Sequence, residues 1–151
     1  MALIIEDGTG VDGADSFTDV DACSAFALAY FGHSLTGSAV AKEAALRRAF
    51  AYMRSLDWVD NAFPTFGGTI PQAVKDAQHI FARAEFESMN ALQPNVTAGQ
   101  TKVLTGVDSL KWEVTGGGGV QAQRQTVLMA LDRLKGLLVT GGGSVTWLDR
   151  A

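Results

Sequence analysis

Four stretches of this chain carry apolar residues at helical spacing, and that pattern constrains the fold more than any other feature. Thr18 and Ser38 can cap the first two helices, and Pro71 suits the first position of the third. The second helix runs to about Leu56, and the fourth begins near Gln121. The apolar stripes are Val20, Cys23, Ala27 and Tyr30; Leu46, Phe50, Met53 and Leu56; Val74, Ala77, Phe81, Ala84 and Ser88; and Val127, Leu128, Leu131, Leu134 and Leu138. We therefore predict a mainly α fold, a small bundle of about four helices.

The pattern changes between the third and fourth helices. Residues 102–105 and 109–114 predict the two strands of a β-hairpin, because Leu110, Trp112 and Val114 alternate with Lys111 and Glu113. A lone hairpin is only marginally stable in water, so it needs another surface to pack against.

Two glycine runs, at 116–119 and 141–143, are typical of flexible hinges. We predict one compact domain with appended segments. These are an extended N-terminal arm (1–17), a helical core (18–96), the hairpin with its hinge (97–119), a C-terminal helix (120–140), and a hinge with an extended tail (141–151). The tail carries Val145, Trp147 and Leu148 beyond its hinge, which suits strand addition to a partner's exposed sheet edge. The alternative is a tail that folds back onto its own domain.

The net charge is −4, and the charges are unevenly distributed along the chain. Of the 16 acidic residues, six precede Lys42, the first basic residue, so the remainder holds ten acidic and 12 basic residues. Binding to phosphates needs clustered Lys and Arg, and Arg47–Arg48 is the densest pair. Nucleic-acid binding as the main task is therefore disfavoured. No apolar run approaches the roughly 20 residues of a membrane-spanning helix, and the first residues lack the basic start of a signal peptide. We expect a soluble protein made in the cytoplasm.

The sequence offers no convincing set of residues for catalysis, a cofactor or a metal. Cys23 lies among alanines, which suits a small buried core residue. His33 follows a glycine, and His79 has Asp76 three residues before it, a spacing typical of a surface pair. The acids from Glu6 onward do not follow the alternation of a calcium loop. We predict that the chain is not an enzyme and holds no cofactor.

A loop over residues 57–69 is rich in aromatic residues. Trp58 and Phe63 could close the open end of the helical core, or they could anchor an interface with another protein. The sequence leaves both possibilities open.

Several segments resemble a phage family often labelled DnaT-like single-stranded-DNA-binding protein. They are residues 2–10, 13–17, 42–49 and 70–77, with Trp58, the strands around Lys102 and Trp112, and an arginine near the C-terminus. Members of that family occur among head and tail genes and resemble head–tail connector, or head-completion, proteins of tailed bacteriophages. The chain departs from the family at Phe63-Pro64-Thr65, where a Trp-Pro-Arg is common.

The resemblance implies a structural virion protein, a head–tail adaptor that forms a ring, typically a dodecamer, beneath the portal protein. Double-stranded DNA would pass through the channel without specific binding, and a tail-side stopper or tail terminator protein would attach below. It places the chain in the virion neck, assembled in the cytoplasm of the bacterial host. Implied portal-binding residues are Val145, Trp147, Leu148 and Arg150, implied inter-subunit hairpin residues are Leu104, Leu110, Trp112 and Val114, and possible channel-lining acids are Asp76, Glu85 and Glu87.

The alternative function is single-stranded-DNA binding, as the family label says. It requires a basic groove interleaved with exposed aromatic residues. The residues that could supply it are Arg47, Arg48, Arg54 and Trp58.

Overall fold

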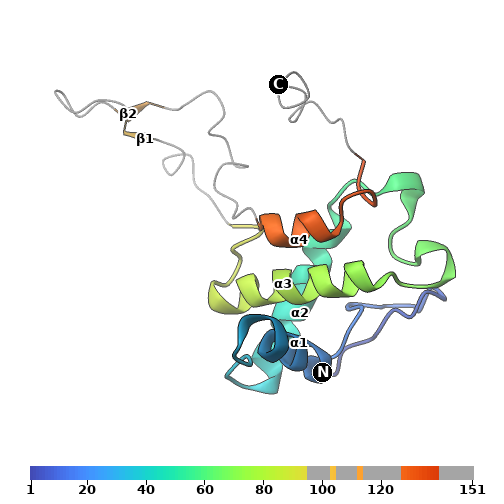
Figure 1. Ribbon diagram of the computed structural model, residues 1–151, viewed down its shortest axis with the longest axis horizontal. Helices are drawn as coiled ribbons and strands as arrows, with labels where there is room; N and C mark the ends of the chain where they lie inside the picture. Colours follow the sequence, from blue (N-terminus) through green and yellow to red (C-terminus); the bar gives the residue numbers. More distant parts are fainter. Residues whose placement is uncertain (95–102, 105–111, 114–126, 140–151) are drawn as a thin grey trace.

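The computed structural model describes residues 1–94, 103–104, 112–113 and 127–139, and four packed helices form the body of this described part. α3 (Gln72–Glu87) lies at the centre, with α4 (Leu128–Arg133) on one side and α1 (Val20–Phe31) on the other (Figure 1). α2 (Ala39–Arg54) packs along α3 and makes the largest contact between any two of these helices. The predicted mainly α bundle of about four helices is confirmed.

The caps of α1 and α2 follow from short polar side chains that accept backbone N–H groups. Ser38 caps α2 as predicted, because its Oγ accepts from the Ala41 N–H at 3.2 Å. α1 is capped by Asp19, whose Oδ1 accepts from the Ala22 N–H at 2.7 Å. The prediction of Thr18 as the cap was wrong by one residue, because the Thr18 hydroxyl is buried 2.9 Å from a nitrogen of His79.

α3 is buried over more of its circumference than a single apolar stripe predicts, because three helices pack around it. Pro71 is the residue before the helix, one position earlier than predicted, and Ser88, which was predicted in the apolar stripe, ends the helix and is exposed. The interior therefore takes in polar side chains of α3 as well, namely Gln78, His79 and Glu85.

The predicted C-terminal helix (120–140) is shorter at its end than its apolar spacing suggested. α4 ends at Arg133, and the chain then turns through Gly136, which has a φ of 90° that suits glycine. Leu138 lies in extended backbone opposite Trp58 rather than on a helical stripe. Residues 120–126, the predicted start of this helix, lie outside the described residues.

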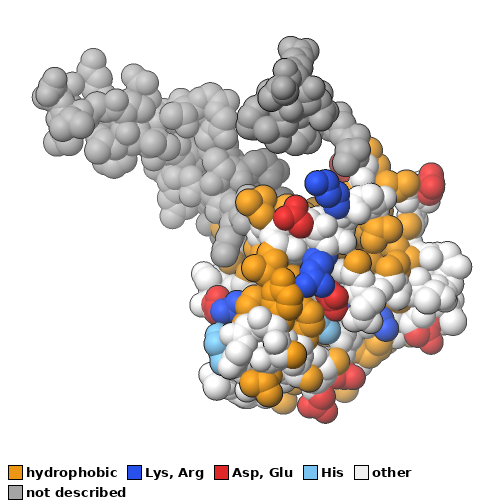
Figure 2. All heavy atoms as spheres, in the orientation of Figure 1, with side chains coloured by type: hydrophobic (Ala, Val, Ile, Leu, Met, Phe, Trp, Pro, Cys, Tyr) orange, Lys and Arg blue, Asp and Glu red, His pale blue; other side chains and the backbone are white. Residues whose placement is uncertain are grey.

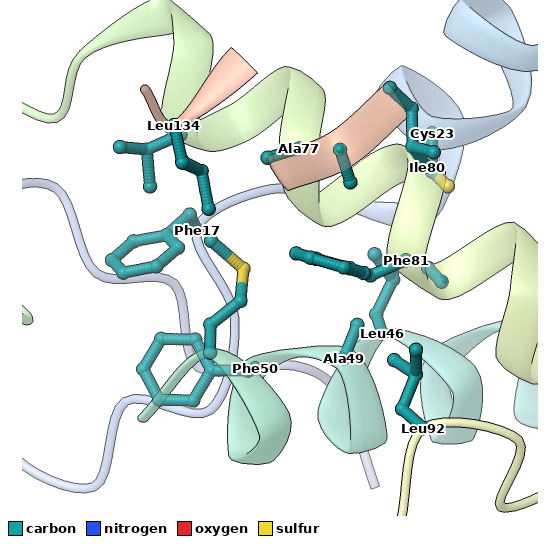
Figure 3. Close-up of a cluster of buried hydrophobic side chains, with 14 of the residues drawn as sticks. Phe17, Cys23, Leu46, Ala49, Phe50, Ala77, Ile80, Phe81, Leu92 and Leu134 are labelled. Atoms are coloured by element: carbon teal, nitrogen blue, oxygen red, sulfur yellow. The ribbon is translucent and has the colours of Figure 1, made fainter. Parts of the chain in front are cut away.

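The core joins all four helices to Phe17, the residue at the end of the predicted N-terminal arm (Figure 3). Fully buried side chains include Leu46, Met53, Phe81 and Leu134. Burial of such a side chain contributes roughly 1.5–3 kcal/mol, so this cluster supplies most of the stability of the body.

Within the region of the predicted hairpin, β1 (Val103–Leu104) pairs antiparallel with β2 (Trp112–Glu113). The rest of the predicted hairpin and both glycine runs lie outside the described residues, so their roles stay predictions. None of the described helices is long and apolar enough to cross a membrane.

Candidate functional site

The end of α2, the aromatic loop and the residues after α4 together form an open groove of about 480 Å³. It is lined by Arg54, Leu56, Asp57, Trp58, Asn61, Phe63 and Val139. In Figure 1 these segments meet at the upper right, where the described chain ends. The groove therefore includes Val139, the last residue that the structure describes.

Backbone hydrogen bonds fix the chain at this point. The Val59 N–H donates to the Leu137 carbonyl at 2.9 Å, and the Val139 N–H donates to the Asp57 carbonyl at 2.8 Å. Residues 137–139 thus run antiparallel to residues 57–59, with Leu138 opposite Trp58. The predicted portal-binding residues, Val145, Trp147, Leu148 and Arg150, follow this anchor and lie outside the described residues.

The aromatic loop closes the helical core, which was one of its two predicted roles. Trp58 is only 7 % exposed, and its Nε1–H donates to the Met53 carbonyl at 2.8 Å. Its ring stacks on Phe63 with centroids 5.6 Å apart and meets Phe66 edge-on at 5.1 Å. Such ring pairs add about 0.5–1.5 kcal/mol beyond their buried area. A ring held in this way is not available to stack on a base.

Arg47 and Arg48 are occupied by contacts within the chain. Arg47 Nε donates to Asp15 Oδ2 at 2.6 Å, and its Nη2 donates to the carbonyls of Met1 and Ala2. Arg48 Nε donates to Glu85 Oε2 at 2.7 Å, and its Nη2 donates to the Glu85 carbonyl. Arg54 differs, because its guanidinium lies 5.5 Å from the Phe50 ring and has no ion pair among the described residues. The predicted basic groove is thus reduced to Arg54.

The three acids named as possible channel residues occupy different environments. Glu85 is 2 % exposed and accepts from the N–H groups of Asn90 and Leu92 as well as from Arg48. Asp76 accepts from Arg133 at 2.8 Å, while the exposed Glu87 pairs with Arg83 at 2.9 Å. Glu85 therefore supports the turn after α3, and only Glu87 is at an open surface of the described chain.

A buried carboxylate organises the loop inside the predicted N-terminal arm. Glu6 is 1 % exposed and accepts three backbone N–H groups, from Gly8, Gly10 and Val11, at 2.8–2.9 Å. Gly8 has a φ of 106° and lies so close to the backbone of Gly68 that a Cβ would collide with it. This carboxylate is used as an acceptor for the loop and is turned away from solvent.

A second polar network ties the same segment to α3. Gln78 Oε1 accepts from the Phe17 N–H at 2.9 Å, and its Nε2 donates to Ser16 Oγ and to the Leu46 carbonyl. His79 Nε2 lies 2.9 Å from Thr18 Oγ1. Burial lowers the pKa of His79 to about 4, so the ring is neutral near pH 7. The predicted surface pair of His79 with Asp76 is wrong, because His79 is buried and Asp76 pairs with Arg133.

Cys23 is buried, as predicted, and burial raises the pKa of its thiol to about 12. His33 lies exposed after the Gly32 cap of α1. Among the described residues, no group of three His, Cys, Asp or Glu side chains is placed to hold a metal ion.

Sequence reasoning missed Glu6, Gln78 and Glu85 as organising residues. Glu6 had a signal, since glycines two and four residues later free backbone N–H groups to turn toward one carboxylate. Gln78 and Glu85 gave none, because their partners are distant in sequence or depend on how the helices pack.

One family model, described as DnaT-like ssDNA binding protein, matches residues 1–65. The match spans the N-terminal segment, α1, α2 and most of the aromatic loop, and it ends before α3. No curated protein and no solved structure matches the chain. The resemblance in residues 70–77 and near the C-terminus, and the connector identity, stay predictions.

Proposed function

We propose that the chain is a structural subunit of a tailed-bacteriophage neck. In this proposal, copies form a ring, typically of twelve, beneath the portal protein and join it to the tail. The observation that carries the proposal is the anchored base of the tail. Residues 137–139 are bonded to residues 57–59, so the segment from 140 to 151 leaves from a fixed point at the groove.

An anchored tail suits an adaptor for a physical reason. Twelve residues can span up to about 40 Å, so the segment can reach a partner while its base stays on the body. A fixed base also limits the volume that Trp147 and Leu148 explore, which raises their effective concentration at a partner that already contacts the body. In a ring, every copy would present one such tail.

The charges of the described residues suit a conduit for DNA that passes without being held. Arg47 and Arg48 are neutralised by Asp15 and Glu85, while Asp7 and Asp12 have no ion pair in the described part. A surface of like charge keeps DNA moving rather than bound.

Single-stranded-DNA binding is a second candidate, and the family match over residues 1–65 favours it. That span contains Arg47, Arg48, Arg54 and Trp58, all four residues of the predicted basic groove. Against it stand the burial of Trp58 and the ion pairs of two of the arginines. Nucleic acid would have to displace those ion pairs or bind through Arg54.

Co-sedimentation with portal rings tests the adaptor proposal. The full-length protein should sediment with the rings, while a chain ending at Gly143 and the double variant Trp147→Ala/Leu148→Ala should stay in solution. Ser144→Ala/Thr146→Ala, in the same segment, is the matched control and should bind like the native protein. Equal binding by the shortened chain would mean that the helical body, and not the tail, contacts the portal. If the full-length protein does not sediment with the rings, the adaptor proposal is rejected.

Retention on single-stranded DNA at moderate salt tests the second candidate. The informative substitution is Arg54→Gln, because it breaks no ion pair of the described chain. Arg48→Ala would instead leave the buried carboxylate of Glu85 without its ion pair and so destabilise the fold. Salt-sensitive retention that Arg54→Gln weakens would support DNA binding. Passage of the native protein through the column would exclude it.

A further inference from the structure

The chain around Ile5 is paired with Ser16 by a single parallel β-bridge, and only along one side. The Ser16 N–H donates to the Ile4 carbonyl at 3.3 Å, and the Glu6 N–H donates to the Ser16 carbonyl at 2.8 Å. In a parallel bridge of this form, the neighbours of the bridged residue make the bonds. The N–H and C=O groups of Ile5 itself therefore point to the opposite side.

That opposite side carries backbone groups without partners. The Ile4 N–H donates to Asp15 Oδ1 at 2.8 Å, so Ile4 uses both of its backbone groups on the paired side. Leu3, one residue earlier, points away from that side as Ile5 does. The N–H and C=O groups of Leu3 and Ile5 make no hydrogen bond within the described part of the chain. Such a row of unpaired groups is a template for a further strand.

An open groove of about 260 Å³ lies beside these two residues. It is lined by Ala2, Leu3, Ile5, Asp19, Val20, Asp21 and Glu43. The side chains of Leu3, Ile5 and Val20 give it an apolar floor, while every charged residue in its lining is acidic. An added strand could thus place alternate side chains in an apolar groove with a negative rim.

The negative charge of the groove is not balanced within the described chain. Asp21 is exposed and has no ion pair there, and Asp19 uses only Oδ1, to cap α1. Glu43 lies 3.8 Å from Arg47, whose Nε is already bound to Asp15 at 2.6 Å. One guanidinium therefore faces two carboxylates and leaves the groove acidic. Figure 2 shows acidic side chains at the lower edge of the molecule, near the N-terminus marked in Figure 1.

We propose that the unpaired side of residues 3–5 binds an extended basic segment of a partner protein, which adds as a strand. Main-chain hydrogen bonds to Leu3 and Ile5 supply the affinity, and Lys or Arg side chains beside the three acids of the groove supply the selectivity. The C-terminal segment of a second copy is a poorer match, because residues 144–151 hold one acidic and one basic residue. This contact does not depend on the proposed neck function.

A nuclear magnetic resonance titration of the full-length protein tests the proposal with a synthetic peptide, Lys-Val-Thr-Val-Thr-Val-Lys, blocked at both ends. The amide protons of Leu3 and Ile5 should shift downfield and exchange more slowly with solvent as peptide is added. The same peptide with Glu in place of Lys should bind at least about tenfold more weakly, since its charges are repelled. A peptide with N-methylated internal amides should not bind, because it cannot donate to the edge.

Two charge-neutralising substitutions separate the groove from the general charge of the protein. Asp21→Asn should raise the Kd for the basic peptide about threefold at low salt. Asp60→Asn is the matched control, since it removes the same charge from an exposed position in the aromatic loop and should leave the Kd native.

Four results would overturn the proposal. They are unshifted Leu3 and Ile5 amides, equal binding of the acidic and basic peptides, binding of the N-methylated peptide, and equal effects of Asp21→Asn and Asp60→Asn. Shifts of the same two amides with protein concentration alone would also overturn it, because a second copy would then occupy the edge.

Discussion

The N-terminal segment (residues 2–18) and the aromatic loop (residues 57–69) both lack long regular structure, yet both are fixed on the helices by opposite means. The N-terminal segment depends largely on polar contacts, because Glu6 accepts N–H groups within it and Gln78 and Arg47 join it to the helices beside the buried ring of Phe17. The aromatic loop is held mainly by the rings of Trp58 and Phe63. Contacts of charged groups depend on pH and salt, whereas the burial of aromatic rings depends on neither. The two segments should therefore lose their native structure under different conditions.

The largest expected loss of stability comes from a substitution in the aromatic loop. Trp58→Ala should lower the free energy of unfolding by about 3–5 kcal/mol, because it empties the space beside Phe63 and Phe66. Trp58→Phe should cost less, since it keeps a ring and mainly loses the bond to the Met53 carbonyl. Urea unfolding measures both. Equal losses for the two variants would mean that the hydrogen bond, not the ring, holds this loop.

Low pH should destabilise the contact between the N-terminal segment and α3, because His79, which lies against Thr18, becomes protonated. Its pKa is about 4 in the folded chain against an ordinary 6.5, so the unfolded chain binds the proton more readily. The stability from neutral His79 is fully present above pH 6.5 and is lost as the pH falls toward 4, by about 3 kcal/mol in all. Thermal unfolding of native protein and His79→Gln across this range should show the steeper loss in the native protein. Parallel curves would contradict it.

Glu6→Gln should destabilise the N-terminal segment by about 1–3 kcal/mol, because an amide cannot accept all three N–H groups that the carboxylate accepts. Asp7→Asn is the matched control next to it, since Asp7 is exposed. Hydrogen exchange at Gly8, Gly10 and Val11 would localise the change. Unaltered protection there would show that another group holds the loop.

The smallest effect belongs to the half-exposed ion pair of Arg47 with Asp15. Arg47→Ala should lower the free energy of unfolding by about 1 kcal/mol at low salt. Added salt should reduce this difference between the variant and the native protein. Trp58→Phe should show no such dependence on salt. A salt-independent loss for Arg47→Ala would mean that its bonds to the Met1 and Ala2 carbonyls, and not the ion pair, matter.

The sequence predicted those features that repeat locally. Helical spacing located α1, α2 and α3 because each buries a stripe of its own residues, and closing the core was one of the two roles left open for the aromatic run. It did not predict the burial of Gln78 or Glu85, whose partners are met only after the helices pack. It also extended the last helix to residue 140, although Gly136 and the bridge of Leu138 to Trp58 end it earlier.

The bonds of Gln78 have a consequence for how the chain acquires its structure. Phe17 and Ser16 are synthesised some sixty residues before the side chain that binds them, at sequence separations of 61 and 62. Contacts between such distant residues form late, since loop closure must precede them. During translation the bonds of this segment to Gln78 therefore cannot form until α3 has left the ribosome. The stretch that ends at residue 65, where the family model stops, is accordingly not a unit expected to fold by itself.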